Sequence, residues 1–383
     1  MHRRLLPLLG LAPLLLASSA ARADTVIVKY RTGRSHAQAD RRAGVIRTVG
    51  RVQGQGARVV AVRGDAADAT RALNRSPGVR YAEPNARLHV LRAPHDPLYT
   101  QMGGLALVHA EAGWATAGLA AFGSARSGVP VGIVDTGIDA GHEDLAGVAR
   151  ACATASGGRV MSGGCADHNG HGTHVAGTIG AIADNGVGIT GLAFYSPLVI
   201  CKALGGAEGA GSLSDVANCI RWVHLRGAKV ISLSLGGGAS TTLRTAVRDA
   251  WKSGRGGGSL IVAAAGNDRD TETSFPAGYD EVVSVAAVDD RGHHATFSNE
   301  NPDVEIAAPG VDVLSAKLGG GYVRFSGTSM ATPHVAAAAA LLWGAHRRSS
   351  PKTIRTLLDA HTTDTGAPGR DPVFGFGVLD LAR

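Results

Sequence analysis

The sequence predicts an α/β protein: a mostly parallel sheet with helices on both faces, forming three layers, preceded by a small α+β domain. Short apolar runs alternate with amphipathic helical stretches, and this alternation favours parallel strands joined by right-handed crossovers. The chain has 383 residues, enough for two to three domains. Hydrophobic residues make up 44% of it and charged residues 18%, so it can bury a large core and is not disordered.

Residues 1–23 are expected to be a secretory signal peptide. Two arginines open it, an apolar run follows over 5–17, and the Ala-Arg-Ala triplet at 21–23 fits the small-x-small rule for cleavage before Asp24. The alternative is a membrane anchor, but the run is too short to span a bilayer. We therefore expect a secreted protein with no membrane partner.

Residues 24–92 form the predicted α+β domain. Strand-like runs, a helical run and a last extended segment fall within it, at residues 26–28, 59–62, 66–73 and 79–84. Pro94 and Pro97 then disfavour helix and mark a linker at the start of the larger domain, residues 93–383.

The larger domain supplies the α/β pattern. Its short apolar runs are candidates for buried strands, at residues 131–135, 198–201, 230–235, 260–264 and 282–288. After the second run, apolar residues recur at helical spacing from Leu213 to Val223, behind Ser212 as a helix cap.

Charge is divided unevenly along a chain whose formal net charge is +7. Residues 1–23 carry three arginines and no acids, and residues 24–92 carry 14 basic and 5 acidic residues, hence +9. Residues 93–383 carry 21 basic and 26 acidic residues, hence −5. A basic groove for nucleic acid on the larger domain is therefore disfavoured.

Four cysteines become candidates for disulfides in an exported protein: Cys152, Cys165, Cys201 and Cys219. They allow three connectivities. We favour the sequential pairing, Cys152 with Cys165 and Cys201 with Cys219, because it closes two short loops. Free buried thiols are the alternative, and the lack of a Cys-x-x-Cys spacing argues against a metal site.

Three polar islands carry residues that could do chemistry. Asp135-Thr136-Gly137 ends a predicted strand, at the edge of the sheet where α/β sites form. His171-Gly172-Thr173-His174 opens a small-residue helix, and Gly327-Thr328-Ser329-Met330-Ala331 lies at a loop-to-helix junction. A serine nucleophile needs an imidazole to take its proton, and the imidazole needs a carboxylate to fix its tautomer. Asp135, His171 and Ser329 are therefore the candidate catalytic residues.

Two further histidines lie inside these islands. His174 follows His171 by three positions, but helical metal pairs usually have the spacing His-x-x-x-His with a Glu between them, which is missing. His334 falls on a different face of the helix from Ser329. We interpret both as structural.

In one chain, in this order and properly spaced, the islands resemble the subtilisin-type secreted serine proteases, over nearly everything after the signal peptide. The resemblance implies that Asp135 orients His171, that His171 is general base and then acid, and that Ser329 is the nucleophile. It also implies that Asn267, in Ala263-Ala264-Ala265-Gly266-Asn267, donates to the oxyanion together with the backbone N–H of Ser329. A simple turn residue is the alternative for Asn267.

The resemblance further implies a substrate cleft. Substrate would bind as an extended strand between two edge segments, Ser234-Leu235-Gly236 and Gly209-Ala210-Gly211. Leu213 and Val216 would line an apolar pocket for the residue four before the cleaved bond. Further cleft residues expected around the primary pocket are Ala264, Gly266 and Ser274. We expect broad specificity that favours large apolar side chains.

A structural calcium site is also implied by the resemblance. The segment 183–189 resembles the family's calcium loop, and all-oxygen ligands suit this ion. The implied ligands are the side chains of Asn185, Asp144 and Asp96 and the backbone carbonyls of Ala183, Val187 and Ile189. An ordinary Asn-Gly turn is the alternative.

The domain at 24–92 resembles the family's propeptide, which is a folding chaperone and an inhibitor; its last strand matches best. We therefore expect a monomeric, self-processed endopeptidase that acts on polypeptides, with no catalytic cofactor. One rival is an inactive relative used for binding, which usually lacks a triad member. Another is an acid-active relative with a Ser-Glu-Asp site, against which His171 in its full motif argues.

Overall fold

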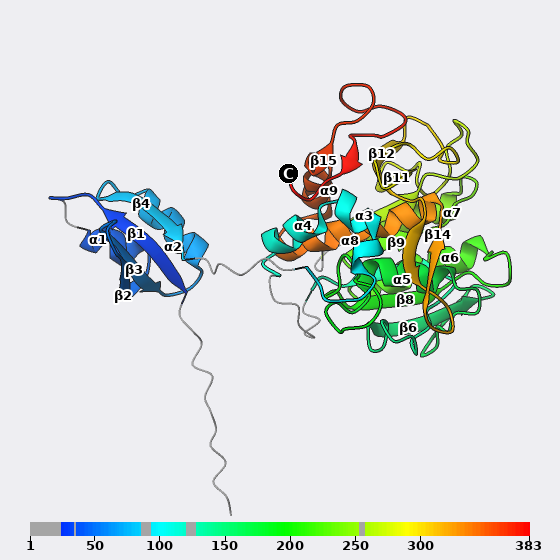
Figure 1. The fold of residues 1–383 in the computed structure, drawn as a ribbon, viewed down its shortest axis with the longest axis horizontal. Coiled ribbons are helices and arrows are strands. Elements are labelled where there is room, and N and C mark those ends of the chain that lie inside the picture. Colours follow the sequence, from blue (N-terminus) through cyan, green and yellow to red (C-terminus); the bar gives the residue numbers. More distant parts are fainter. Residues whose placement is uncertain (1–23, 34–35, 86–92, 120–127, 253–256) are drawn as a thin grey trace, which may run out of the picture. The chain divides into compact units, whose positions relative to one another are not determined.

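The computed structural model describes residues 24–33, 36–85, 93–119, 128–252 and 257–383. The chain divides into two compact units, Met1–His89 and Val90–Arg383 (Figure 1). The predicted signal peptide, residues 1–23, and the end of the predicted propeptide, residues 86–92, lie outside the described residues.

The N-terminal unit is a four-stranded antiparallel sheet in the order β2-β3-β1-β4, with two helices. Val26 and Val28 on β1 are buried with Leu73 of α2, and Ile27 between the two valines is less buried, as strand alternation requires. Its elements are β1 (Thr25–Tyr30), α1 (Ala37–Arg42), β2 (Val45–Val52), β3 (Ala57–Val62), α2 (Ala66–Asn74) and β4 (Val79–Pro84). The predicted strands and helix are confirmed; β2 and α1 were not predicted.

The C-terminal unit is built on a ten-stranded sheet in the order β15-β16-β12-β11-β10-β9-β5-β8-β6-β7. All neighbouring pairs are parallel except the outermost on each side, β15-β16 and β6-β7. The strands are β5 (Val131–Asp135), β6 (Ala149–Ser156), β7 (Arg159–Ser162), β8 (Leu198–Lys202), β9 (Val230–Leu233), β10 (Leu260–Ala264), β11 (Val282–Val288), β12 (Val304–Pro309), β15 (Thr362–Thr363) and β16 (Val378–Leu379). The predicted mostly parallel sheet is confirmed.

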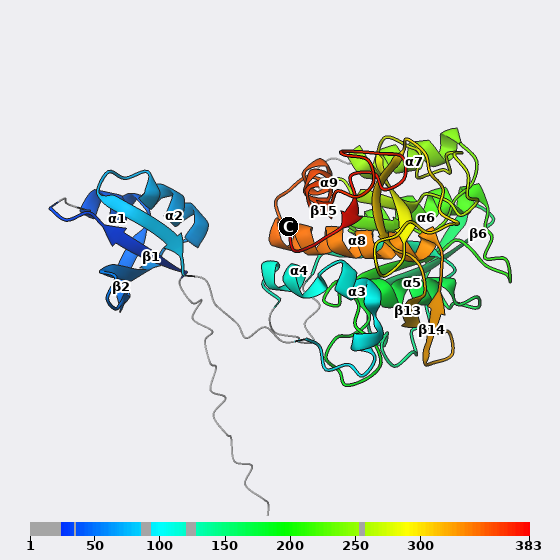
Figure 2. The ribbon, with the colours of Figure 1, turned by 45° about the horizontal axis from the view of Figure 1, so that its top comes forward.

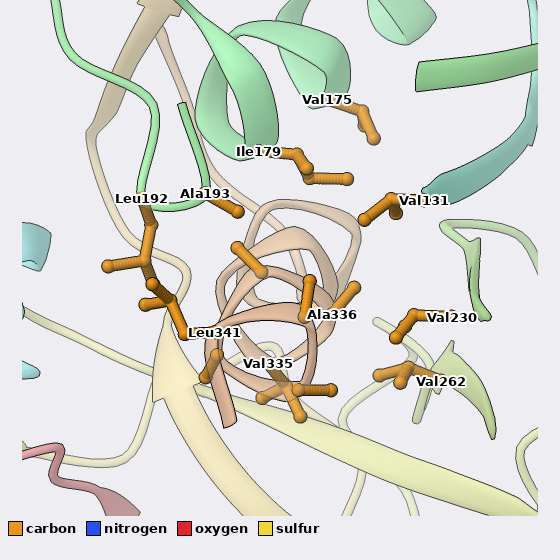
Figure 3. Packing of buried hydrophobic residues seen from close by; sticks show 14 of the residues in the cluster. Val131, Val175, Ile179, Leu192, Ala193, Val230, Val262, Val335, Ala336 and Leu341 are labelled. Atoms are coloured by element: carbon orange, nitrogen blue, oxygen red, sulfur yellow. The ribbon is translucent and has the colours of Figure 1, made fainter. Parts of the chain in front are cut away.

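Helices cover both faces of this sheet, as predicted. One face packs on α5 and α8, where Val131, Val230 and Val262 of the strands lie on the side of α8 that carries Ala336 (Figure 3). The other face packs on α6 and α7, where Ile231 meets Ile220 and Val247. Figure 2 shows α8 running through the middle of the unit. The helices are η1 (Tyr99–Gln101), α3 (Gly103–Leu107), α4 (Ala110–Thr116), α5 (His171–Gly180), α6 (Leu213–Leu225), α7 (Thr241–Lys252), α8 (Thr328–Ala345) and α9 (Pro351–Ala360).

The strand order changes direction at β5, which pairs with β8 on one side and with β9 on the other. In open α/β sheets such a switch point leaves a crevice beyond the carboxyl ends of the strands. Asp135 is the last residue of β5. The topology thus places the first of the three polar islands where a site can form.

A two-stranded antiparallel sheet, β13 (Val313–Ala316) and β14 (Tyr322–Phe325), leads into α8. The two disulfides join Cys152 to Cys165 and Cys201 to Cys219, which is the predicted sequential pairing. Within the described ranges, no helix combines the length and the apolar character that crossing a bilayer would require.

Candidate active site

Asp135 is fully buried at the end of β5. Its Oδ1 accepts hydrogen bonds from the Thr136 backbone N–H at 2.7 Å and from His171 Nδ1 at 2.8 Å. Its Oδ2 is buried and has no hydrogen-bond partner among the described residues. The carboxylate is therefore shielded from water and aimed at one imidazole.

His171 is the first residue of α5, and its side chain is 27% exposed. Burial lowers the pKa of this imidazole, but the charge and hydrogen bond of Asp135, with the charge of Asp167, outweigh burial and leave the pKa above its usual value. The carboxylate therefore favours the protonated ring. This is the electrostatic arrangement that a base needs when it holds a proton during a reaction.

Glycines allow α5 to approach β5 this closely. A Cβ at Gly172 would lie 2.3 Å from the Gly137 carbonyl oxygen and 3.1 Å from Asp135 Oδ1. Gly137 has a φ of 119°, a region that side chains rarely adopt. The Gly172 N–H donates to Thr136 Oγ1 at 2.8 Å. The first two islands thus form one packed unit.

Two residues that the sequence analysis missed hold the start of α5. Asp167 accepts from the N–H groups of Asn169, Gly170 and Thr173 and from the Thr173 hydroxyl, at 2.7–3.1 Å. Burial raises the pKa of Asp167, but these hydrogen bonds outweigh it and the pKa lies below its usual value. Asn169 accepts from the His171 N–H at 3.2 Å. An acid or amide just before a helix is the available sequence signal for such capping.

Ser329 is the second residue of α8. Pro333, four residues later, has no N–H to bond the Ser329 carbonyl, and Ser234 Oγ donates to that carbonyl instead, at 2.8 Å. The Ser329 hydroxyl in turn donates to the Ser234 carbonyl at 3.3 Å. Ser234 also lines a cleft together with His171. The structure thus ties Ser329 to the edge of the cleft that contains His171.

Asn267 lies beside the start of α8. Its Oδ1 accepts from both the N–H and the hydroxyl of Thr328, each at 2.9 Å, which fixes the orientation of the amide. If Gly327 carried a Cβ, that atom would lie 3.6 Å from Asn267 Nδ2 and 3.7 Å from the Ser329 nitrogen. Two N–H donors therefore border the same small space beside Ser329.

The cleft has a volume of about 530 Å³. It includes eight of the eleven residues predicted to contact substrate: Gly209, Ala210, Gly211, Leu213, Val216, Ser234, Leu235 and Gly236. Phe275, next to the predicted Ser274 in a segment expected near the primary pocket, also lines it, as do Leu204 and Leu243, which were not predicted. The lining thus mixes these apolar side chains with polar ones, among them Thr136 and Asn169, and Glu208 is its acid.

The other three predicted substrate residues lie outside this lining. Ala264 is a buried residue at the end of β10. At Gly266 a Cβ would lie 2.5 Å from Asn299 Nδ2, and a Cβ at Gly236 would lie 2.2 Å from Ser274 Oγ. Ser274 is therefore in contact with the wall of the cleft.

The two remaining histidines are buried core residues, as interpreted. His174 stacks on Phe325, and its Nε2 bonds to the Val313 carbonyl at 2.9 Å. His334 Nδ1 bonds to the Met330 carbonyl at 2.9 Å. Burial lowers the pKa of each to about 4, so both are neutral near pH 7.

The residues predicted to hold calcium lie together. Both oxygens of Asp96 accept from backbone N–H groups at 184–186 or from the Thr190 hydroxyl. Asp144 accepts from Asn185 Nδ2 at 2.7 Å, from the Ile189 N–H at 2.8 Å and from Tyr322 OH at 2.8 Å. Burial raises the pKa of Asp144, and the nearby charge of Asp96 adds to this rise.

Comparison with family models gives two matches. Residues 126–377 match the subtilase family, and residues 17–85 match the fervidolysin N-terminal prodomain. The two matches fall on the two units of the chain.

Individual proteins are similar as well. The chain is 39% identical over 282 residues to the thermophilic serine proteinase of Bacillus sp. (strain AK1), covering 71% of this chain and 65% of that protein. It is 41% identical over 245 residues to subtilisin DY of Bacillus licheniformis, covering 62% and 85%. A solved protease structure from Pseudoalteromonas arctica superposes with a TM-score of 0.66 at 29% identity, covering 76% and 98%. The chain thus spans about two thirds of the length of the first of these relatives.

Proposed function

The chain belongs to the subtilase family of serine endopeptidases, and from that premise we propose that it is a secreted endopeptidase, made as a self-processed zymogen, whose triad is Asp135, His171 and Ser329. The observation that carries the triad is the buried Asp135 carboxylate, which holds His171 Nδ1 at 2.8 Å in a cleft bordered by Ser234, whose hydroxyl bonds to the Ser329 carbonyl.

In the proposed reaction, the Ser329 hydroxyl turns from the Ser234 carbonyl toward His171 Nε2. The imidazole takes its proton while Oγ attacks the peptide carbonyl carbon, and then gives that proton to the leaving amine. A water repeats the sequence to release the acyl group. Asp135 keeps its charge and stabilises the imidazolium, which is consistent with the raised pKa of His171.

Asn267 Nδ2 and the Ser329 N–H are proposed to stabilise the oxyanion that forms during the attack. Both border the space beside Gly327, and the Thr328 hydrogen bonds keep the amide nitrogen turned toward it. Donors that are already oriented cost little reorganisation at the moment of reaction.

We propose that polypeptide binds as an extended strand between the segments 209–211 and 234–236, which border one cleft. Apolar walls such as Leu213 and Phe275 favour large apolar side chains. The small N-terminal unit matches a prodomain family, and its proposed roles are to inhibit the enzyme until cleavage and to assist folding. The signal sequence at 1–23 would direct export.

A structural calcium ion at the 183–189 loop remains our proposal, and the residues present fit it. Asp96 and Asp144 are 4% and 0% exposed, and among the described residues no ion pair reaches either one. Buried carboxylates without a positive partner are costly, and a cation would relieve that cost. No group of three or more acidic, histidine or cysteine ligands occurs in the described part of the chain, so Asn185 and backbone carbonyls would complete the site. Its contribution would be to stability.

The deciding experiment replaces Ser329 by alanine in the full chain, expressed in a protease-free host. We expect uncleaved proprotein, negligible peptidase activity and no labelling by a serine-directed phosphonate. Ser326→Ala is the matched control, because that exposed hydroxyl accepts from the Asp312 N–H instead, and it should mature normally. Normal maturation of Ser329→Ala would refute the assignment, and a rate that persists below pH 5 would favour the acid-active alternative.

A further inference from the structure

We propose that Asn169 is a positioning residue that couples the substrate-binding edge at 205–211 to the catalytic base. The proposal rests on the proposed function, because it assumes that His171 is the base and that substrate lies along this edge. Asn169 lies two residues before His171, half-buried, and borders the same cleft.

The Asn169 side chain uses both ends of its amide. Its Oδ1 accepts from the His171 backbone N–H at 3.2 Å, one of the N–H groups that a helix leaves without an internal partner. Its Nδ2 donates to the carbonyls of Gly206 and Ala207, at 3.0 and 3.1 Å. One rigid amide plane therefore joins the start of α5 to a separate segment of chain.

That segment is a small hairpin. Gly205 and Ala210 bond to each other in both directions, at 2.9 and 3.0 Å, and glycines with positive φ at 206 and 209 turn the chain. Its tip, residues 206–208, is exposed, and its second arm runs into Gly209–Gly211 along the cleft. The carbonyls bound by Asn169 are thus at the tip of the hairpin whose arm would pair with substrate.

The loop before His171 is tied to the same region a second time. Lys202 Nζ, at the end of β8, donates to the Ala166 carbonyl at 2.8 Å and contacts His168 Nδ1 at 3.1 Å. Lys202 therefore holds the first part of this loop, but it does not bond to the backbone of His171. Of the two side chains, Asn169 makes that bond. When an extended substrate pairs with the hairpin and fixes its position, the hydrogen bonds of the Asn169 amide also fix the position of the His171 backbone.

This coupling makes a specific kinetic prediction. Asn169 should raise kcat/KM for a long peptide that reaches the 209–211 arm. It should have little effect on kcat/KM for a single-residue ester that does not reach this arm. The measured quantity is the ratio of kcat/KM for a tetrapeptide anilide to kcat/KM for the ester of its last residue. Purely structural damage would lower both values together and leave the ratio unchanged.

Two variants separate the two ends of the amide. Asn169→Ala removes every contact, and the ratio should fall about tenfold, as expected for loss of one to two hydrogen bonds. Asn169→Asp keeps an acceptor for the His171 N–H but loses the donors to the hairpin. It should show the same fall in the ratio, with a smaller loss than Asn169→Ala on the ester.

Asn218→Ala is the matched control, because the side chain of Asn218 also donates to a backbone carbonyl, that of Gly158 at 2.8 Å, but away from His171. Its ratio should equal that of the unaltered enzyme. All proteins are made as the full chain and titrated with a serine-directed phosphonate, so that rates refer to competent sites. An unchanged ratio in both Asn169 variants would overturn the coupling, whereas absent titration of the unaltered enzyme would overturn the proposed function itself.

Discussion

Replacing Gly172 by alanine tests whether the close approach of α5 to β5 positions His171. The new Cβ would lie 2.3 Å from the Gly137 carbonyl oxygen and 3.1 Å from Asp135 Oδ1. The first neighbour is backbone and the second belongs to a fully buried side chain, so neither can move aside cheaply. Because the van der Waals contact distance between non-bonded heavy atoms is about 3.5 Å, the start of α5 must move away by about 1 Å.

That retreat has two calculable effects. The hydrogen bond between His171 Nδ1 and Asp135 Oδ1, now 2.8 Å, would stretch beyond the range of a hydrogen bond. A catalytic group displaced by about 1 Å costs on the order of 100-fold in rate, so kcat/KM should fall about 100-fold. Overpacking should also lower the free energy of unfolding by about 1–3 kcal/mol.

The assay measures kcat/KM per titrated site, together with thermal unfolding. Gly164→Ala is the control, because a Cβ there would meet no atom within 4 Å and the residue precedes the same helix. It should keep full activity. A Gly172→Ala enzyme within threefold of the unaltered one, or an equal loss in Gly164→Ala, would show that this contact does not position the base.

Three further predictions concern charge and ions. Asp167→Asn removes a negative charge that raises the pKa of His171. The acid limb of the pH profile of kcat/KM, where His171 is protonated, should therefore move to lower pH. An unmoved limb would contradict this. Excess chelator should lower the melting temperature before it lowers the rate, because an ion bound to the folded state stabilises it by mass action; an unmoved melting temperature would argue against the ion. The isolated fragment 24–92 should inhibit the mature enzyme, because its net charge of +9 attracts the net charge of −5 on residues 93–383. The association rate should fall several-fold from low to physiological salt, because the Debye length shrinks from about 30 to about 8 Å. Stopped-flow inhibition measures that rate, and a salt-independent rate would remove the electrostatic steering.

Much of this fold follows from local pattern. The run at 131–135 is apolar throughout and ends in an acid, and it is a strand buried along its whole length. Ser212 caps α6 as predicted, accepting from the Asp215 N–H at 3.1 Å. Cys152 and Cys165 lie close in sequence and pair. These features depend on neighbours along the chain, which a single sequence displays.

The features that were missed depend on residues distant in sequence. Asn169 looks like any polar loop residue until the hairpin near Gly206, on a different segment, comes within reach of it. Half-buried Arg355 forms an ion pair with buried Glu305, and nothing in the residues around either one indicates the other. Strand β2 carries the exposed apolar residues Ile46 and Val49, so its pattern gives no clear buried face.

The topology around β5 also determines the order in which parts of the site can form during synthesis. Val131 pairs with Leu198 on one side and with Val230 on the other, and these parallel partners must be found across long stretches of chain. Such distant pairing slows folding. Because Ser329 lies later still, a ribosome-bound chain contains the proposed acid and base, Asp135 and His171, before it contains the proposed nucleophile. The proposed peptidase site therefore cannot be complete before Ser329 has been synthesised.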